Sequence, residues 1–143
     1  MKTIRTLIAA LSIICIYHAA KAAPEEASKK ISAKNAVSGF MNAFTEGRLK
    51  GFAQMLDENV KFTITRGNKI ITYGKTAILK DLERTTNVHQ NCETDYTLVK
   101  SLPNQVIFRI DMKYENFIRE NFVTLVESND GWRITHIASS YRK

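Results

Sequence analysis

One histidine near the end of the chain is best placed, by type and by context, to take part in acid–base chemistry. His136 lies within "NDGWRITHIASS", residues 129–140, where a tight turn is followed by alternating apolar and polar residues. Histidine titrates near neutral pH and is a frequent general acid or base. Because side chains alternate along a strand, His136 shares a face with Trp132 and Ile134, and we expect all three on the core side.

The preceding strand adds a polar partner for this histidine. A turn with Gly131 in the left-handed conformation predicts that Thr124 pairs with His136. The same register predicts two further pairs: Val126 with Ile134, and Phe122 with Ala138. Two interpretations of His136 stay open, a hydrogen-bonded histidine of the core and a pocket residue that contacts a ligand or transfers a proton.

Two acidic residues and one tyrosine on the expected strands are further candidates for the same chemistry. A carboxyl group that is forced inward has a raised pKa and can act as an acid. Asp111 alternates with apolar neighbours, so we expect it to face outward and to be solvated. Glu120 alternates with Phe122 and is better placed to face inward. Tyr96 could add a hydroxyl group, although an aromatic residue at strand spacing is also typical of a core.

The cysteine and histidine positions predict neither an internal disulfide nor a metal site. Cys15 lies in the first 22 residues, so Cys92 stands alone in the rest of the chain. We interpret it as buried and inert, with intermolecular pairing as the alternative. His89 and Cys92 lie close together in "HQNC", but no second pair of ligands follows at the spacing of a zinc site. We therefore expect no metal and no cofactor.

The first 22 residues have the pattern of a secretory signal peptide. A basic start, "MKTIR", precedes the apolar run "TLIAALSIICIY", and "AKA" ends at Ala22. The apolar run is shorter than the roughly 20 residues that a membrane-spanning helix needs. We expect cleavage after Ala22, export to the periplasm or the extracellular medium, and no stable membrane insertion afterwards. An uncleaved anchor is the alternative.

The rest of the chain suits one compact domain with a mildly basic surface. Residues 23–31 are polar and are expected to form a flexible lead, and residues 32–143 are expected to form the domain. Three of the 21 Lys and Arg residues leave with the signal peptide, so the formal net charge falls from +7 by three. The remaining basic residues are interleaved with acidic ones, which argues against nucleic-acid binding.

Hydrophobic spacing predicts three helices. Apolar residues recur at helical spacing from Ser32, and the helix is expected to end at Gly47. A second short helix is expected in "RLKGFAQMLDENV", ending before Asn59. The segment "GKTAILKDLERTT" predicts a third helix that begins just after Gly74.

Alternating and β-branched runs predict six strands. "VKFTIT" and "KIITY", separated by "RGN", predict a hairpin. Four further runs with short connections predict an antiparallel meander: "CETDYTLVKS", "QVIFRIDMKY", "FIRENFVTLVES" and "WRITHIASSY". The layout is α+β, with the apolar face of the sheet covering the helices.

This order of elements resembles the nuclear transport factor 2-like superfamily, a cone-shaped α+β fold shared by ketosteroid isomerase, SnoaL-like polyketide cyclases and scytalone dehydratase. Its most specific segments are "FMNAFTEGRLKGFAQMLDENVKF", "YGKTAI" and "GWRITH", and the resemblance covers most of residues 32–142. It implies three N-terminal helices packed on a strongly curved, mainly antiparallel six-stranded sheet of the cystatin-like kind. It also implies a pocket between the helices and the inner sheet face. Similar secreted bacterial members are described as lumazine-binding-like.

The catalytic pattern of ketosteroid isomerase is absent from the matching positions. Such members use a carboxylate base from the first strand region, together with a phenol and a protonated carboxylic acid. Here "VKFTITRG" contains neither a carboxylate nor a histidine. The first helix offers Phe40 and Phe44 but no tyrosine. No catalytic residue is assigned, and His136 remains the one candidate.

The sequence therefore predicts an exported domain that binds a small, largely apolar molecule. The expected ligand-binding residues are His136, Thr124, Glu120, Trp132, Tyr96, Phe40 and Phe44. One alternative is a cofactor-independent isomerase, cyclase or dehydratase that uses His136 as acid or base. The other is a dimeric protein-interaction module.

A homodimer is expected to form through the outer face of the meander. Val123, Leu125 and Ile137 fall on the face opposite Trp132, which would leave apolar area exposed on a lone domain. Exposed apolar patches of this kind usually mark a contact with another protein.

Overall fold

The computed structural model describes residues 30–143, so the expected signal peptide and most of the expected lead lie outside the described residues. The elements in chain order are α1 (Ala33–Glu46), α2 (Phe52–Met55), β1 (Leu56–Arg66), β2 (Lys69–Tyr73), α3 (Lys75–Glu83), β3 (Glu93–Leu102), β4 (Gln105–Lys113), β5 (Ile118–Ser128) and β6 (Gly131–Arg142). Helix α3 follows the first hairpin instead of standing at the N-terminus.

All six strands belong to one open, twisted sheet with the order β2-β1-β6-β5-β4-β3. Strands β3 to β6 pair with their neighbours in antiparallel fashion, which confirms the predicted meander. Strand β1 joins the sheet by parallel pairing with β6, and β2 pairs with β1 in the predicted hairpin. The α+β class with a mainly antiparallel six-stranded sheet is therefore confirmed.

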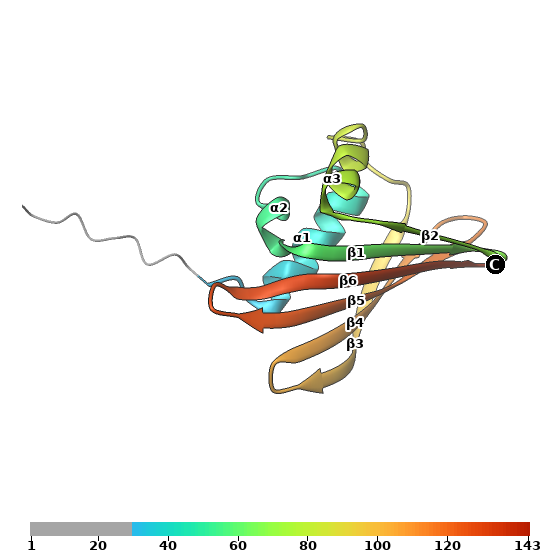
Figure 1. The fold of residues 1–143 in the computed structure, drawn as a ribbon. Helices are drawn as coiled ribbons and strands as arrows, with labels where there is room; N and C mark the ends of the chain where they lie inside the picture. The colour runs from blue at the N-terminus through green and yellow to red at the C-terminus, as the bar shows by residue number, and fades with distance from the viewer. Residues whose placement is uncertain (1–29) are drawn as a thin grey trace, which may run out of the picture.

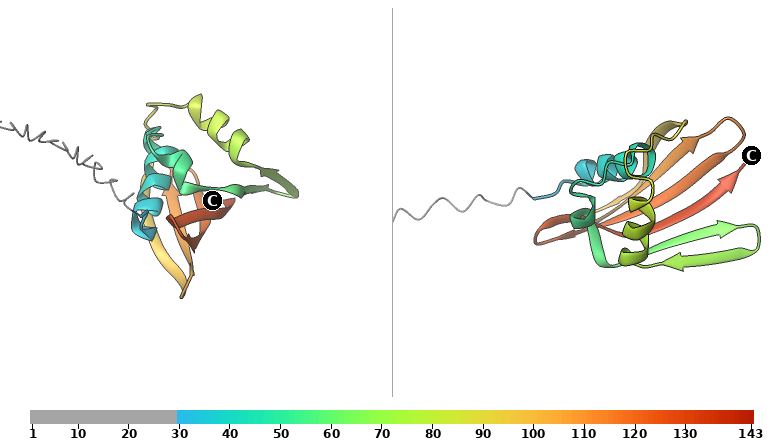
Figure 2. Two further views of the ribbon diagram at one scale, coloured as in Figure 1. Left: turned by 60° about the vertical axis from the view of Figure 1, so that its left-hand side comes forward. Right: turned by 90° about the horizontal axis from the view of Figure 1, so that it is seen from above.

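The helices lie on one face of this sheet, as Figures 1 and 2 show from three directions. We call this face the helix-facing side and the opposite one the outer face. In the views of Figure 2, α1 crosses the strands and α3 stands beside the β1–β2 hairpin.

Helix α1 begins and ends where the sequence predicts. The side chain of Ser32 accepts a hydrogen bond from the Asn35 amide at 3.1 Å and so caps the first turn. Gly47 ends the helix with a φ of 61°, a conformation that favours glycine. A Cβ atom at this position would lie 2.3 Å from the carbonyl oxygen of Thr85, so no side chain fits here without movement of the backbone.

The second helix is shorter than predicted. It spans Phe52–Met55 only, and strand β1 begins at Leu56, within the segment that was assigned to the helix. Leu56 pairs with Ile134 of β6, and its side chain is buried. A short apolar run is compatible with both helical and strand spacing, and here pairing with β6 decides between them.

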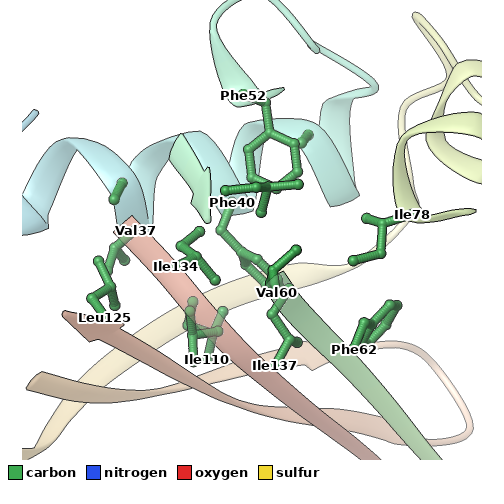
Figure 3. Close-up of a cluster of buried hydrophobic side chains, with 14 of the residues drawn as sticks. Val37, Phe40, Phe52, Val60, Phe62, Ile78, Ile110, Leu125, Ile134 and Ile137 are labelled. Carbon is green, nitrogen blue, oxygen red and sulfur yellow. The ribbon is translucent and has the colours of Figure 1, made fainter. Parts of the chain in front are cut away.

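The core lies between the helices and the helix-facing side of the sheet. Figure 3 shows Val37 and Phe40 of α1 above Ile134, Ile137 and residues of β1. The fully buried side chains include residues from α1, α2, β1, β4, β5 and β6: Val37, Phe40, Phe52, Val60, Ile110, Val123, Leu125, Ile134 and Ile137. One hydrophobic layer thus fixes the helices to the middle of the sheet.

A β-bulge in β6 changes which residues of this strand face the core. Thr124 pairs with His136 as predicted, but Leu125 pairs with Ile134, so Thr135 has no partner on β5. The predicted pairing of Val126 with Ile134 is wrong, since Val126 pairs with Arg133. A bulge inserts one residue and so shifts the alternation of side chains by one position.

The bulge also overturns the expected position of the proposed dimer patch. Val123, Leu125 and Ile137, which were expected on the outer face, are each 0% exposed and belong to the core. Ile134 faces the core on one side of Thr135, and Ile137 faces it on the other.

Candidate functional site

A cavity of about 480 Å³ lies on the helix-facing side, between α1, α3 and the β1–β2 hairpin. Both helices and both strands of the hairpin contribute to its apolar lining, which includes Phe44, Phe62, Ile64, Tyr73, Ile78 and Leu82. In Figure 3, Phe62 of β1 and Ile78 of α3 lie together at one side of the core cluster. The helical spacing that predicted α3 places Ile78 and Leu82 on the buried face of that helix.

Charged side chains line the same cavity, and most of them are basic. Arg66 comes from the end of β1, and Lys80, Asp81 and Arg84 come from the end of α3 and the residue after it. All four are exposed, and Arg84 lies 4.0 Å from the Asp81 carboxylate. The charged lining therefore carries three cations against one anion.

A further cation, Arg119 of β5, lies against two aromatic rings of the cavity lining. The central carbon of its guanidinium lies 5.2 Å from the ring centroid of Phe44 and 5.6 Å from that of Phe62. Burial lowers the pKa of Arg119, while nearby tyrosine hydroxyls act in the opposite direction. Arginine keeps its charge in proteins, so this pKa shift reflects the cost of holding a cation in an apolar environment.

A buried polar network orients Arg119. Its Nε donates a hydrogen bond of 3.1 Å to Ser139 Oγ on β6, and the Ser139 hydroxyl donates to Asn121 Oδ1. Asn121 Nδ2 in turn donates to the carbonyl oxygen of Ile110 at 3.1 Å. Asn121 and Ser139 are both buried and face each other across β5 and β6. The donors and acceptors of the network therefore have defined directions.

Tyr114, beyond the end of β4, stays protonated over a wide pH range. Burial raises the pKa of Tyr114 to about 12, and the neighbouring Cys92 adds to the shift. Its hydroxyl donates to Gln90 Oε1 at 3.4 Å. Cys92 is half-buried where burial was predicted, and the pKa of its thiol is raised by burial, which disfavours the reactive thiolate.

His136 lies on the outer face, away from the cavity. Its Nε2 lies 3.4 Å from Thr63 Oγ1 of β1, and its pairing partner on the neighbouring strand β5 is Thr124. The expectation that His136 faces the core together with Trp132 and Ile134 is wrong. The physical reason is the unpaired Thr135, which reverses the alternation between Ile134 and His136.

Glu120 and Asp111 lie side by side on the outer face, in an ion-pair cluster. Glu120 was expected to face inward, but it lies 4.0 Å from Arg109 Nε and 3.7 Å from Arg142 Nε. Asp111 faces outward as predicted, yet it is 3% exposed instead of solvated. Arg109 and Arg142 approach its two carboxylate oxygens at 3.5 and 3.6 Å. The two arginines therefore offset the negative charge of Asp111, while its Oδ1 has no hydrogen-bond partner among the described residues.

The aromatic residues of the predicted site are divided between wall, core and surface. Phe44 lines the cavity, and Phe40 is fully buried and stacks on it with a centroid distance of 4.4 Å. Trp132 is partly buried and packs against the core cluster. Tyr96 on β3 is 44% exposed and contacts the ring of Phe108. Of the seven predicted ligand-binding residues, Phe44 is the one in the cavity lining.

Within residues 30–143, no cluster of three or more His, Cys, Asp or Glu side chains is arranged to hold a metal ion. None of the helices in this part of the chain is long and apolar enough to cross a membrane.

Comparisons with known proteins find matches at the level of structure. No family model matches the chain, and no curated protein matches it. A nuclear transport factor 2-like protein of unknown function from Silicibacter pomeroyi is similar with a TM-score of 0.65 and 12% identity, covering 76% of this chain and 92% of that one. A similar protein of unknown function from Methylobacillus flagellatus has a TM-score of 0.61 and 15% identity, covering 77% and 89%. A ketosteroid isomerase-like protein from Erwinia carotovora atroseptica has a TM-score of 0.58 and 10% identity, covering 77% and 93%.

Proposed function

Because the chain has the nuclear transport factor 2-like fold, we propose that it binds a small, largely apolar molecule in the cavity between α1, α3 and the β1–β2 hairpin. The observation that carries the proposal is the cavity itself. Its volume of about 480 Å³ falls within the range of about 300–1,000 Å³ typical of ligand pockets. Its walls are mainly apolar, with a few charged groups at the edge, which is the usual composition of such pockets.

The packing of α1 supports ligand binding over a pure interaction module. Phe40 belongs to the core, and Phe44 stands at the wall instead of filling the space. The opening therefore persists beside a fully packed core, and an apolar ligand can bury its surface there without displacing Phe40.

The positions of the polar candidates argue against the enzyme alternative in this cavity. His136, Thr124 and Glu120 share the outer face, and no side-chain hydrogen bond joins His136 to either of the other two among the described residues. An isomerase, cyclase or dehydratase that used His136 would need its substrate on the outer face of the sheet.

A fluorescence titration tests the proposal. N-phenyl-1-naphthylamine, a neutral apolar probe that brightens in apolar pockets, is expected to bind the wild-type protein with saturation. Ala77→Trp places a large side chain in the cavity from α3 and is expected to weaken binding at least about tenfold. Thr76→Trp is the matched control, because Thr76 is exposed on the same helix and does not line the cavity. Equal binding by the wild type and Ala77→Trp would contradict the proposal.

Export and pairing belong to the same proposal. The N-terminal pattern supports cleavage after Ala22 and export to the periplasm or medium, and the intact mass of the exported chain is expected to begin at Ala23. A product that retains Met1 would contradict this.

Pairing of two copies would use the outer face, where Phe122 of the central strand β5 is 37% exposed and no described helix covers the sheet.

A further inference from the structure

We infer that the ligand of this cavity carries an oxyanion, such as a carboxylate or a sulfonate, which binds the guanidinium of Arg119 while the apolar body lies against Phe44 and Phe62. The inference rests on the proposed function, because it names the chemical class of that ligand. An uncharged apolar molecule could bind through the apolar lining alone, so a negative charge on the ligand is a separate inference that rests on Arg119.

Arg119 lacks a carboxylate partner in the described part of the chain. No Asp or Glu oxygen of residues 30–143 approaches its guanidinium within 4.0 Å. Asp111 and Glu120, which pair across β4 and β5, form ion pairs with Arg109 and Arg142 on the outer face. A cation in an apolar environment without a counterion is unfavourable, so an anionic ligand would gain more here than at an exposed arginine.

The unused donors of Arg119 suit an oxyanion. Its Nε binds Ser139, but no hydrogen bond joins either Nη atom to residues 30–143. Among buried side-chain polar atoms of these residues, Asp111 Oδ1 is the one that lacks a partner. The Nη groups are therefore not sealed in the core, and they reach accessible space. Two adjacent Nη donors in one plane match the two oxygens of a carboxylate.

The neighbours of Arg119 hold it in place. Phe44 and Phe62 contact the guanidinium, and the chain of hydrogen bonds from Ser139 to Asn121 fixes the direction of its Nε. A donor group that is already oriented loses little conformational entropy on binding. Arg119 is not itself a lining residue, but Phe44 and Phe62, which its guanidinium contacts, both line the cavity, so the cation lies next to it.

The exposed cations of the lining add a supporting field. Lys80 forms no ion pair within the described residues, and Arg66 hydrogen-bonds the hydroxyl of Tyr141 at 3.4 Å. These charges attract an anion toward the cavity. They are exposed and screened by salt, so they are not expected to select the ligand by themselves.

Two probes with the same aromatic body test the inference. N-phenyl-1-naphthylamine is neutral, and 1-anilinonaphthalene-8-sulfonate is the same skeleton with a sulfonate. The wild-type protein is expected to bind the sulfonate at least about tenfold more tightly, as a charge-assisted hydrogen bond would provide. Arg119→Met keeps an apolar stem beside the two rings and is expected to abolish this preference while changing binding of the neutral probe less than about threefold.

Two further variants separate a specific contact from general attraction. Lys61→Met removes the same charge from an exposed position on β1, next to His136 on the outer face, and is expected to leave the preference unchanged. Arg119→Lys keeps the charge but lacks the two parallel N–H donors of the guanidinium, so an intermediate preference for the sulfonate over the neutral probe is expected. If thermal melts show that Arg119→Met does not fold, Arg119→Lys decides the question.

The outcomes distinguish this inference from the proposed function. Equal affinity of the wild type for both probes would overturn the inference and leave apolar binding in place. An equal loss of sulfonate binding in Lys61→Met and Arg119→Met would overturn it as well. Failure of the neutral probe to bind the wild type, with the sulfonate bound, would support the anion site and contradict the proposed apolar ligand. Failure of both probes to bind would overturn both.

Discussion

Arg119 of β5 and Ser139 of β6 form a hydrogen bond of 3.1 Å on the side of the sheet that faces the helices. The two residues lie diagonally across the strand pair, since Arg119 pairs with Tyr141 and Ser139 pairs with Asn121. This contact joins the buried polar network of the core to the cation beside the cavity. It links the stability of the sheet to the geometry of the site.

Ser139→Ala is therefore expected to destabilise the protein. The change leaves Arg119 Nε and Asn121 Oδ1 without their partner, and such unsatisfied groups typically cost about 1–3 kcal/mol. Ser140→Ala, on the outer face of the same strand, is expected to stay within about 0.5 kcal/mol. Urea unfolding of both variants measures the difference. Similar effects of the two changes would show that the network contributes nothing to stability.

His136→Ala is expected to have little effect on either stability or ligand binding. His136 is half-buried on the outer face and has one long contact with Thr63, so a loss below about 1 kcal/mol is expected. Trp132→Ala removes an aromatic side chain that packs against the core, and a loss near 3 kcal/mol, the lower end for such deletions, is expected. Thermal melts and probe titration check both. A selective loss of probe binding in His136→Ala would contradict the position of this side chain on the outer face.

The stability of the folded state is expected to fall in alkaline solution because of Tyr114. The pKa of this phenol is raised from 10.0 to about 12 by burial, so the folded state holds its proton more tightly than the unfolded state. This contribution is complete below pH 10 and is lost as the pH rises from about 10 to about 12. Urea unfolding at several pH values measures the slope, and Tyr114→Phe is expected to flatten it. An unchanged slope in this variant would assign the effect to other groups.

Two copies of the chain are expected to pair through the outer face. Phe122→Glu puts a charge at the exposed centre of this face and is expected to give single chains in sedimentation at tens of micromolar. Leu98→Glu is the control, because Leu98 is also exposed but pairs with Phe108 on the helix-facing side. A wild-type protein that sediments as one chain would rule out the dimer at this concentration.

Spacing and turn residues in the sequence predict most of the elements, because the local rules and the tertiary contacts agree there. The cap at Ser32, the stop at Gly47 and the connections of the meander all lie where the sequence indicates. The start of β1 could not be predicted in the same way, because Leu56 joins the sheet through parallel pairing with Ile134, a contact distant in sequence. Local spacing carries no information on such a contact.

The site was harder to predict than the fold because one bulge decides which side chains face the cavity. Nothing in "WRITHIAS" marks Thr135 as the extra residue, so strict alternation assigns His136 to the wrong face. The apolar residues Val123 and Leu125 on β5 could have shown which face of that strand is buried. Asn121 and Arg119 lie at the same alternate positions of β5, and the structure places them on the helix-facing side as well.

The most direct test of ligand binding in the cavity is methyl NMR of isoleucine-labelled protein during titration with N-phenyl-1-naphthylamine. Ile64 and Ile78 line the cavity, whereas Ile107 pairs with Thr124 on the outer face. If the probe binds in the cavity, the Ile64 and Ile78 methyl resonances are expected to shift saturably and the Ile107 resonance to stay unchanged. Shifts confined to Ile107, or no shifts at saturating probe, would contradict binding in the cavity.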